Sequence, residues 1–126
     1  MQLINNAPAV PAAVGPYSQA VQCGGFLFCS GQLPIDPATG KIEAAGTEDQ
    51  ARQVLANISA LLASQNRAMS DVVKATVFLT DMADFPAVNP IYAAAFGDHK
   101  PARSTVQVAA LPLAAKIEIE VIVAAA

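Results

Sequence analysis

The sequence predicts an α+β fold: one mixed β-sheet with two α-helices packed against a single face. Three observations support this prediction. Two strand-like segments come first, two helix-like segments with a strand between them follow, and two strand-like segments close the chain. The 126 residues correspond to one domain, residues 1–126, because a chain of this length forms a single core. Two helices cover only one sheet face, so the other face needs a different cover.

The first two strands are predicted at residues 17–23 and 26–30, where apolar and aromatic side chains are frequent. Gly24 and Gly25 between them fit a two-residue hairpin turn. The following segment, "IDPATGK", is predicted to be a loop, since Asp-Pro starts a turn and glycine closes it. A third strand is expected at residues 72–80, which are rich in β-branched residues.

The first helix is predicted at residues 48–65. Thr47 and Gln50 have the spacing of a capping box. Apolar residues then recur every three or four positions, at Ala51, Val54, Leu55, Ile58, Leu61 and Leu62.

The second helix is predicted to begin with Asp84 as its cap and to end at Gly97. Pro90 lies inside it and is expected to kink the helix or delay its start, because proline removes one backbone hydrogen bond. Its apolar face comprises Phe85, Val88, Tyr92, Ala95 and Phe96.

The last segment, residues 101–124, has the pattern of two strands joined by a Leu-Pro turn. Arg103 opens the first strand, and Glu118 and Glu120 share one side of the second. If the two strands pair as a hairpin, Arg103 can share a sheet face with the glutamates. One interpretation is a solvated face with ordinary cross-strand ion pairs. The other is a functional site.

The composition suggests that other subunits cover part of the surface. Charged residues are 13% of the chain and apolar residues 54%, whereas the usual charged fraction is about 25%. Such a composition, together with an uncovered sheet face, favours a homo-oligomer. The net charge of −3 and the lack of any Lys/Arg run disfavour a nucleic acid partner.

The sequence favours a cytoplasmic protein with no cofactor and no metal. The N-terminus lacks the basic and apolar regions of a signal peptide, and no segment has the roughly 20 apolar residues of a membrane span. Cys23 and Cys29 fit reduced thiols, and Cys29 fits a buried small hydrophobe better than a nucleophile. His99 is the single histidine, which argues against a metal site.

Four segments, in order and at matching spacing, resemble the Rid family, the reactive intermediate deaminases that also carry the label endoribonuclease L-PSP. The resemblance covers residues 6–123, nearly the whole chain. The segments are "NAPAVPAAVGPYSQAV", "FCSGQLPIDPATGKI", "DFPAVNPIYAAAF" and the closing "PARSTVQVAALPLAAKIEI".

The resemblance implies a fold like chorismate mutase of the AroH class, and a homotrimer with clefts at the subunit interfaces. It also implies a reaction. Enamines of the 2-aminoacrylate type, released by pyridoxal-phosphate enzymes, tautomerise to imines such as 2-iminopropanoate and 2-iminobutanoate. Water then attacks the imine and gives a 2-keto acid and ammonium.

The resemblance assigns roles to two charged residues. Arg103 would hold the substrate carboxylate, since its planar guanidinium can bind a carboxylate bidentately. Glu118 would orient and activate the water as a general acid–base group. The resemblance also places Tyr17, Ser30, Gly31, Asn89 and Thr105 along the cleft.

Alternatives stay open. Tyr17, Ser30 and Asn89 also have ordinary structural roles available, and Glu120 is the other candidate acid. A non-catalytic trimer that binds 2-keto acids would use Arg103 in the same way. Endoribonuclease activity is disfavoured by the acidic composition and by the lack of a basic patch. The loop before Arg103 carries Lys100 where many members have phenylalanine, so the preferred substrate side chain is open.

Overall fold

The fold is one six-stranded sheet with both long helices on the same face. The computed structural model describes residues 1–125. The strand order is β1-β2-β3-β6-β4-β5; β4 and β5 are parallel and all other neighbours antiparallel. The elements are β1 (Gln2–Ile4), β2 (Ala20–Cys23), β3 (Phe26–Cys29), α1 (Thr47–Ser64), β4 (Val72–Leu79), α2 (Phe85–Phe96), β5 (Ala102–Gln107) and β6 (Ile117–Ala124).

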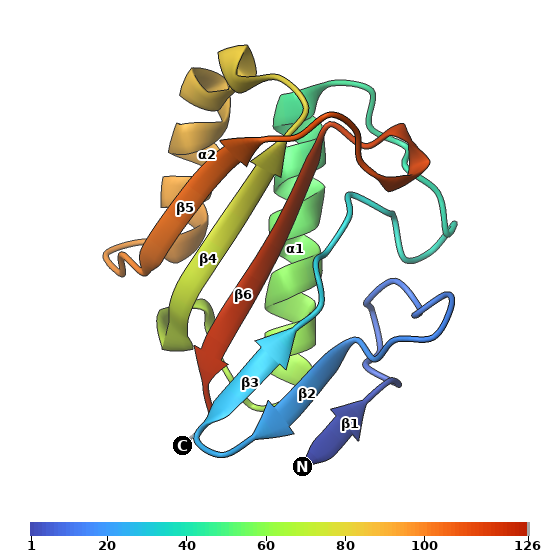
Figure 1. Cartoon of the computed structure of the whole chain (residues 1–126), viewed down its shortest axis with the longest axis vertical. Helices are drawn as coiled ribbons and strands as arrows, with labels where there is room; N and C mark the ends of the chain where they lie inside the picture. The colour runs from blue at the N-terminus through green and yellow to red at the C-terminus, as the bar shows by residue number, and fades with distance from the viewer. Residues whose placement is uncertain (126) are drawn as a thin grey trace.

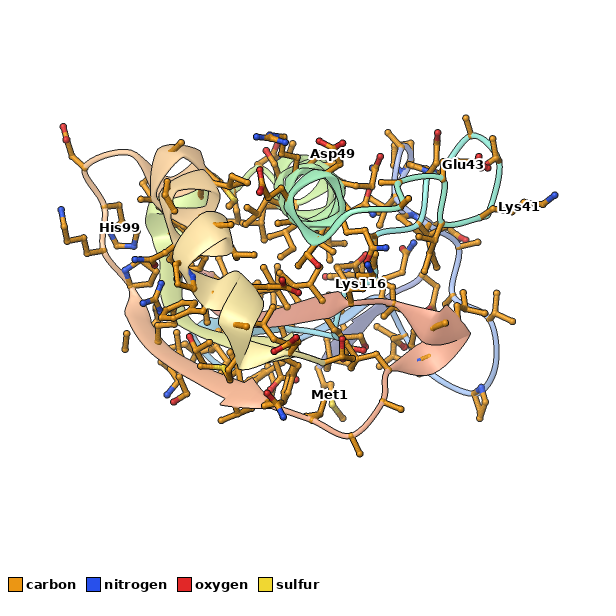
Figure 2. All side chains as sticks on the ribbon, turned by 90° about the horizontal axis from the view of Figure 1, so that it is seen from above. Met1, Lys41, Glu43, Asp49, His99 and Lys116 are labelled. Atoms are coloured by element: carbon orange, nitrogen blue, oxygen red, sulfur yellow. The ribbon has the colours of Figure 1, made fainter. Side chains whose placement is uncertain are left out.

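Figures 1 and 2 show α1 and α2 on one side of the sheet, while the other side is left open. This arrangement confirms the predicted mixed sheet backed by two helices. The core lies between the two layers, where Ala75 and Val77 of β4 and Ile117 and Ile119 of β6 are buried against the helices. In the part of the chain that the structure describes, no helix is long and apolar enough to cross a membrane.

The open face carries exposed apolar side chains. Phe26 and Phe28 of β3 are 44% and 45% exposed, and Val106 of β5 is 42% exposed. A soluble monomer seldom leaves a contiguous apolar surface without a partner. The face therefore fits the expected contact with other subunits, which remains a prediction.

The predicted hairpin of the last two strands is wrong. β5 pairs in parallel with β4, and β6 lies between β3 and β4. The physical reason is the α2 crossover, because a connection that contains a helix is long enough to bring β5 back parallel to β4. Residues 108–116 then carry the chain past the end of β4 to its other side. This segment includes the 3₁₀ turn Pro112–Ala114.

The first strand prediction needs two corrections. Regular pairing of β2 begins at Ala20, so Tyr17 precedes the strand. The short edge strand β1 was not predicted; it pairs with β2 through Gln2–Ile4. Three residues without clear alternation are too few to give a strand signal in the sequence.

The helix caps also differ from the prediction. The N-cap of α1 is Gly46 without a side-chain bond, and the Thr47 hydroxyl donates instead to the Asp84 carboxylate at 2.8 Å. Asp84 makes no capping bond to α2. This pair ties together the beginnings of the two helices. Pro90 does not delay α2, which starts at Phe85, and Gly97 ends the helix with a positive φ of 62° as predicted.

Candidate functional site

The strand register places Arg103 and the two glutamates on opposite faces of the sheet. Arg103 lies opposite Ala75, which is fully buried under the helices. Glu118 lies opposite Phe78, and Glu120 is opposite Thr76. Because paired residues point to the same side of a sheet and alternate along a strand, Arg103 faces the helices and the glutamates face the open side. The expectation that they share a face is therefore wrong for a single chain.

Arg103 is held by three side chains of α2. Its guanidinium donates to Oδ1 of Asn89 at 2.8 Å. The Cζ atom lies 5.0 Å from the ring centroid of Phe85 and 4.8 Å from that of Tyr92, which are cation–π distances. These three residues share one side of α2 because they follow at spacings of four and three. Asn89 therefore acts as the partner of Arg103 in this structure.

A cavity of about 390 Å³ lies beside Arg103. Asn89 and Tyr92 line it together with Lys100 and His99 from the loop that joins α2 to β5. Thr105 lies on the same side of β5 as Arg103, and its hydroxyl is buried without a hydrogen-bond partner in the described structure. The Tyr92 hydroxyl is likewise buried without a hydrogen-bond partner in the described structure. Burial raises the pKa of Tyr92, and the nearby Arg103 partly opposes this rise.

A larger cavity of about 920 Å³ contains the other predicted residues. Tyr17, Ser30, Gly31, Glu118 and Glu120 supply its polar lining. Apolar walls come from the N-terminal segment, the loop after β3 and the turn before β6, including Val14, Leu33, Ile35 and Leu113. No residue lines both this cavity and the one beside Arg103. The structure thus brings the predicted residues together as two separate groups.

Gly31 leaves room for the Glu118 carboxylate. A Cβ atom at Gly31 would lie 2.9 Å from Cδ of Glu118 and closer still to its Oε2. Real Cβ atoms essentially never approach that closely, so a larger residue would displace the carboxyl group. Mutual hydrogen bonds between the backbones of Gln32 and Ile119 keep the two segments together.

Ser30 and Tyr17 are fixed near this carboxylate by backbone groups. The Ser30 hydroxyl donates to the carbonyl oxygen of Ser18 at 2.6 Å, so it faces a ligand as an acceptor. The Tyr17 hydroxyl accepts a long bond of 3.4 Å from the backbone N–H of Val14. Its own proton remains available for a ligand, because a phenol both donates and accepts.

Glu118 has an environment suited to proton transfer. Loss of solvent by burial raises its pKa, and repulsion by the carboxylate of Glu120 raises it further. Within residues 1–125 the one salt bridge joins Arg52 to Asp49, so no cation pairs with Glu118. A carboxyl group whose pKa is moved toward neutrality can both accept and donate a proton.

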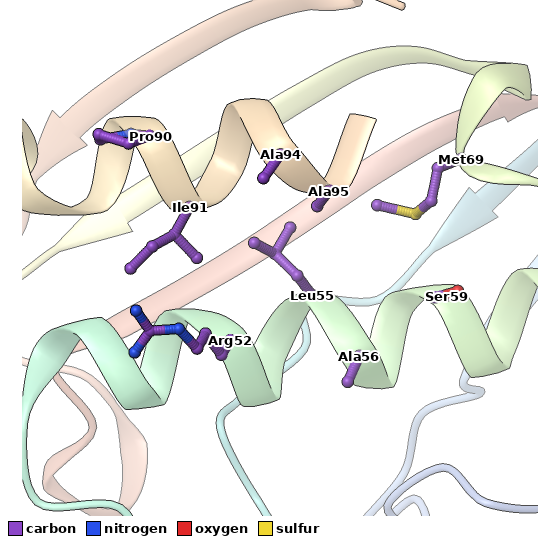
Figure 3. A pocket seen from close by; sticks show the side chains of 9 residues that line it. All are labelled: Arg52, Leu55, Ala56, Ser59, Met69, Pro90, Ile91, Ala94 and Ala95. Atoms are coloured by element: carbon purple, nitrogen blue, oxygen red, sulfur yellow. The ribbon is translucent and has the colours of Figure 1, made fainter. Parts of the chain in front are cut away.

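Other potentially reactive groups are not part of such a site. Burial raises the pKa of Cys29 to about 12, which keeps it a thiol, in agreement with the sequence interpretation. Across the described residues, no group of three or more His, Cys, Asp or Glu is placed to hold a metal ion. A cavity of about 570 Å³ between α1 and α2 is mainly apolar, and its charged residue, Arg52, already pairs with Asp49 at 2.6 Å (Figure 3).

Sequence reasoning missed the contribution of Phe85 and Tyr92. Both were assigned only to the apolar face of a helix. Their spacing with Asn89 was a usable signal, since residues at i, i+4 and i+7 share one helix face. The sequence did not show that an edge strand brings Arg103 against that face.

Comparison with known proteins identifies the family. A family model described as Endoribonuclease L-PSP matches residues 7–125. Reactive Intermediate Deaminase A, chloroplastic, of Arabidopsis thaliana is 54% identical over 112 residues, which cover 89% of this chain and 60% of that protein.

Solved structures agree in fold. RidA from the Antarctic bacterium Psychrobacter sp. superposes with a TM-score of 0.92 at 44% identity, covering 98% of this chain and 99% of that one. Escherichia coli TdcF with bound serine gives 0.91 at 42% identity and covers 98% of both chains. The chain therefore belongs to the Rid family, the reactive intermediate deaminases described in the matching model as endoribonuclease L-PSP.

Proposed function

We propose that this protein hydrolyses 2-imino acids of the 2-iminopropanoate and 2-iminobutanoate type to 2-keto acids and ammonium. Arg103 holds the substrate carboxylate, and Glu118 orients and activates the attacking water. The observation that carries the proposal is Glu118 itself: within one chain it is a carboxyl group with a raised pKa and no cationic partner, placed at a polar patch in a mostly apolar cavity. Its relatives named as reactive intermediate deaminases support the same reaction class.

The chemistry needs one group that takes and returns a proton. Glu118 accepts a proton from water as the water oxygen bonds to the carbon of the N-protonated imine, and the π electrons of the C=N bond move to nitrogen. The protonated Glu118 then donates this proton to the amine of the neutral carbinolamine. As the C–N bond breaks, the hydroxyl proton passes to Glu118, the ketone forms, and Glu118 returns the proton to the departing ammonia. In sum, one protonated imine and one water give one ketone and one ammonium. A pKa raised toward neutrality suits both steps.

We further propose that the site is assembled between subunits of a homotrimer. Arg103 faces the helices, whereas Glu118 faces the open side of the sheet, so one substrate cannot contact both within a single chain. A symmetric ring repeats the same head-to-tail contact at each interface. Each interface then combines the Arg103 and Asn89 group of one subunit with the Tyr17, Ser30 and Glu118 cavity of another.

A binding role without catalysis is the second candidate. It is favoured by the solved structure of TdcF with bound serine, a relative that holds a small carboxylate-bearing molecule. Such a binder needs Arg103 but does not need a carboxyl group with a raised pKa.

RNA binding is expected to be weak, because positive charge is not clustered over a broad surface. The exposed free thiol of Cys23 fits a reducing compartment, and we place the activity in the cytoplasm.

The decisive assay measures keto-acid release from an enamine made in situ. Threonine dehydratase supplies the intermediate, and 2-oxobutanoate is followed with and without this protein, with spontaneous hydrolysis as the baseline. Faster release with the native protein and no acceleration with Glu118→Gln supports the deaminase. If the protein binds 2-oxobutanoate but never accelerates release, it is a binder and the proposal fails.

A further inference from the structure

The cavity beside Arg103 is lined by basic groups that no carboxylate neutralises. Arg103, Lys100 and His99 line this space of about 390 Å³, and no Asp or Glu among the described residues lines it. Asp98 lies on the same loop, but the salt bridge found in residues 1–125 is between Arg52 and Asp49. In a chain with a net charge of −3, Arg103 and Lys100 place two positive charges at one cavity.

The loop that joins α2 to β5 positions these groups. Gly97 turns the chain with a positive φ of 62°, and His99 then lies beside the end of α2 (Figure 2). The Nε2 atom of His99 is 2.6 Å from the carbonyl oxygen of Val72. A carbonyl can only accept, so Nε2 carries a hydrogen and the ring is anchored to β4. The anchored loop holds Lys100 next to the cavity instead of leaving it on a free turn.

A second, independent observation concerns Tyr92. This residue also lines the cavity, yet it is only 7% exposed and its hydroxyl has no hydrogen-bond partner in the described structure. Buried hydroxyls are nearly always bonded. The wall of the cavity thus contains an unsatisfied polar group in addition to the basic side chains.

We propose that this cavity is a subsite for a second carboxylate, so that the protein also accepts 2-imino acids with an acidic side chain, the 2-imino dicarboxylates. The proposal rests on the deaminase function proposed above. Arg103 binds the carboxylate next to the imine, and Lys100 binds the one at the end of the side chain. Lys100 and Arg103 are three residues apart, which in extended chain is about 10 Å. Both residues line the cavity, whose volume of about 390 Å³ leaves space for a diacid of four or five carbons.

The test compares two imines in the same protein. 2-Iminoglutarate is made in situ from glutamate and 2-iminopropanoate from alanine, each by an amino-acid oxidase, and spontaneous hydrolysis is subtracted. Lys100→Met keeps the length of the side chain but removes its charge. We expect kcat/KM for 2-iminoglutarate to fall about tenfold or more, as for loss of one charge-assisted contact. The value for 2-iminopropanoate should stay within about twofold, within the usual range of surface substitutions.

Lys41→Met is the matched control, because Lys41 is an exposed lysine far from His99 and its loop (Figure 2). It should change neither substrate. A parallel calorimetric titration compares 2-oxoglutarate with 2-oxobutanoate, and Lys100→Met should weaken only 2-oxoglutarate.

The outcomes separate this inference from the proposed function. If native protein deaminates 2-iminopropanoate but not 2-iminoglutarate, or if Lys100→Met affects both equally or neither, the second subsite is refuted while the deaminase stands. If neither imine is turned over, the deaminase fails. The titration still decides the subsite in that case, since equal binding of 2-oxoglutarate by native protein and Lys100→Met would overturn it.

Discussion

Replacing Gly31 by alanine should impair catalysis far more than folding. The added methyl would lie 2.9 Å from Cδ of Glu118, whereas ordinary contacts begin near 3.4 Å. The carboxyl carbon must therefore move away by at least the difference between these two distances, and the nearer oxygen by about 1 Å. A misplacement of that size can lower the rate about 10²-fold. Glu118 is a flexible side chain with access to the cavity, so it can rotate away.

The stability cost should be small by comparison. A side chain forced off its preferred rotamer costs about 0.5–1.5 kcal/mol, which corresponds to a fall in Tm of about 4 °C for a domain of this size. The assay is keto-acid release beside thermal unfolding on the same preparation. Gly25→Ala is the control, because nothing lies within 4 Å of a Cβ there and its backbone has no positive φ.

The double variant Gly31→Ala with Glu118→Gln distinguishes the mechanism. If the alanine acts only by displacing Glu118, the double variant loses no more activity than Glu118→Gln alone, a strongly non-additive result. Additive losses, or full activity in Gly31→Ala, would show that this glycine is not needed to position the carboxylate.

Three further predictions follow from the same geometry. Arg103→Ala should abolish both 2-keto-acid binding and turnover, since hydrogen bonds to charged groups contribute about 1.5–3 kcal/mol each. Arg103→Lys should restore little, because lysine lacks the planar fork of the guanidinium. Near-native binding by Arg103→Lys in calorimetry would contradict this. Because the folded-state pKa of Glu118 is raised above its ordinary 4.5, folding takes up a proton there and stability falls as pH rises through the folded pKa. Glu118→Gln should therefore unfold at a higher temperature than native protein at pH 7, with the difference vanishing below about pH 4.5; a variant that is less stable at pH 7 would show that the carboxylate is stabilised instead. The open sheet face should make the protein a homotrimer, and sedimentation that shows a stable monomer of 12.9 kDa at micromolar concentration would exclude it.

Local patterns in the sequence predicted the local structure well. The apolar spacing of α1 and the glycine that ends α2 were both confirmed, because each depends on neighbours within one or two turns. The capping box failed because Thr47 found a better partner in Asp84, which lies 37 positions away in the chain. A side chain with both local and distant partners available cannot be assigned from its neighbours alone.

The pairing of the strands was the main feature that the sequence did not predict. Residues 108–116 contain a Leu-Pro turn that predicts a hairpin connection, although in the structure they carry the chain across the end of β4. This error also put Arg103 on the wrong face, since the phase of β5 is set by its pairing with β4. The family resemblance named a set of candidate residues, yet it did not show that one chain separates them into two groups.

Mixed oligomers show directly whether Arg103 and Glu118 act from different chains. Arg103→Ala and Glu118→Gln are each expected to be inactive alone. When the two variants are coexpressed in equal amounts with different tags and purified without sorting, random mixing gives an intact pair at about a quarter of the interfaces in a cyclic trimer. We expect about a quarter of native deaminase activity to return. Mixed trimers that are confirmed by both tags and remain inactive would contradict it.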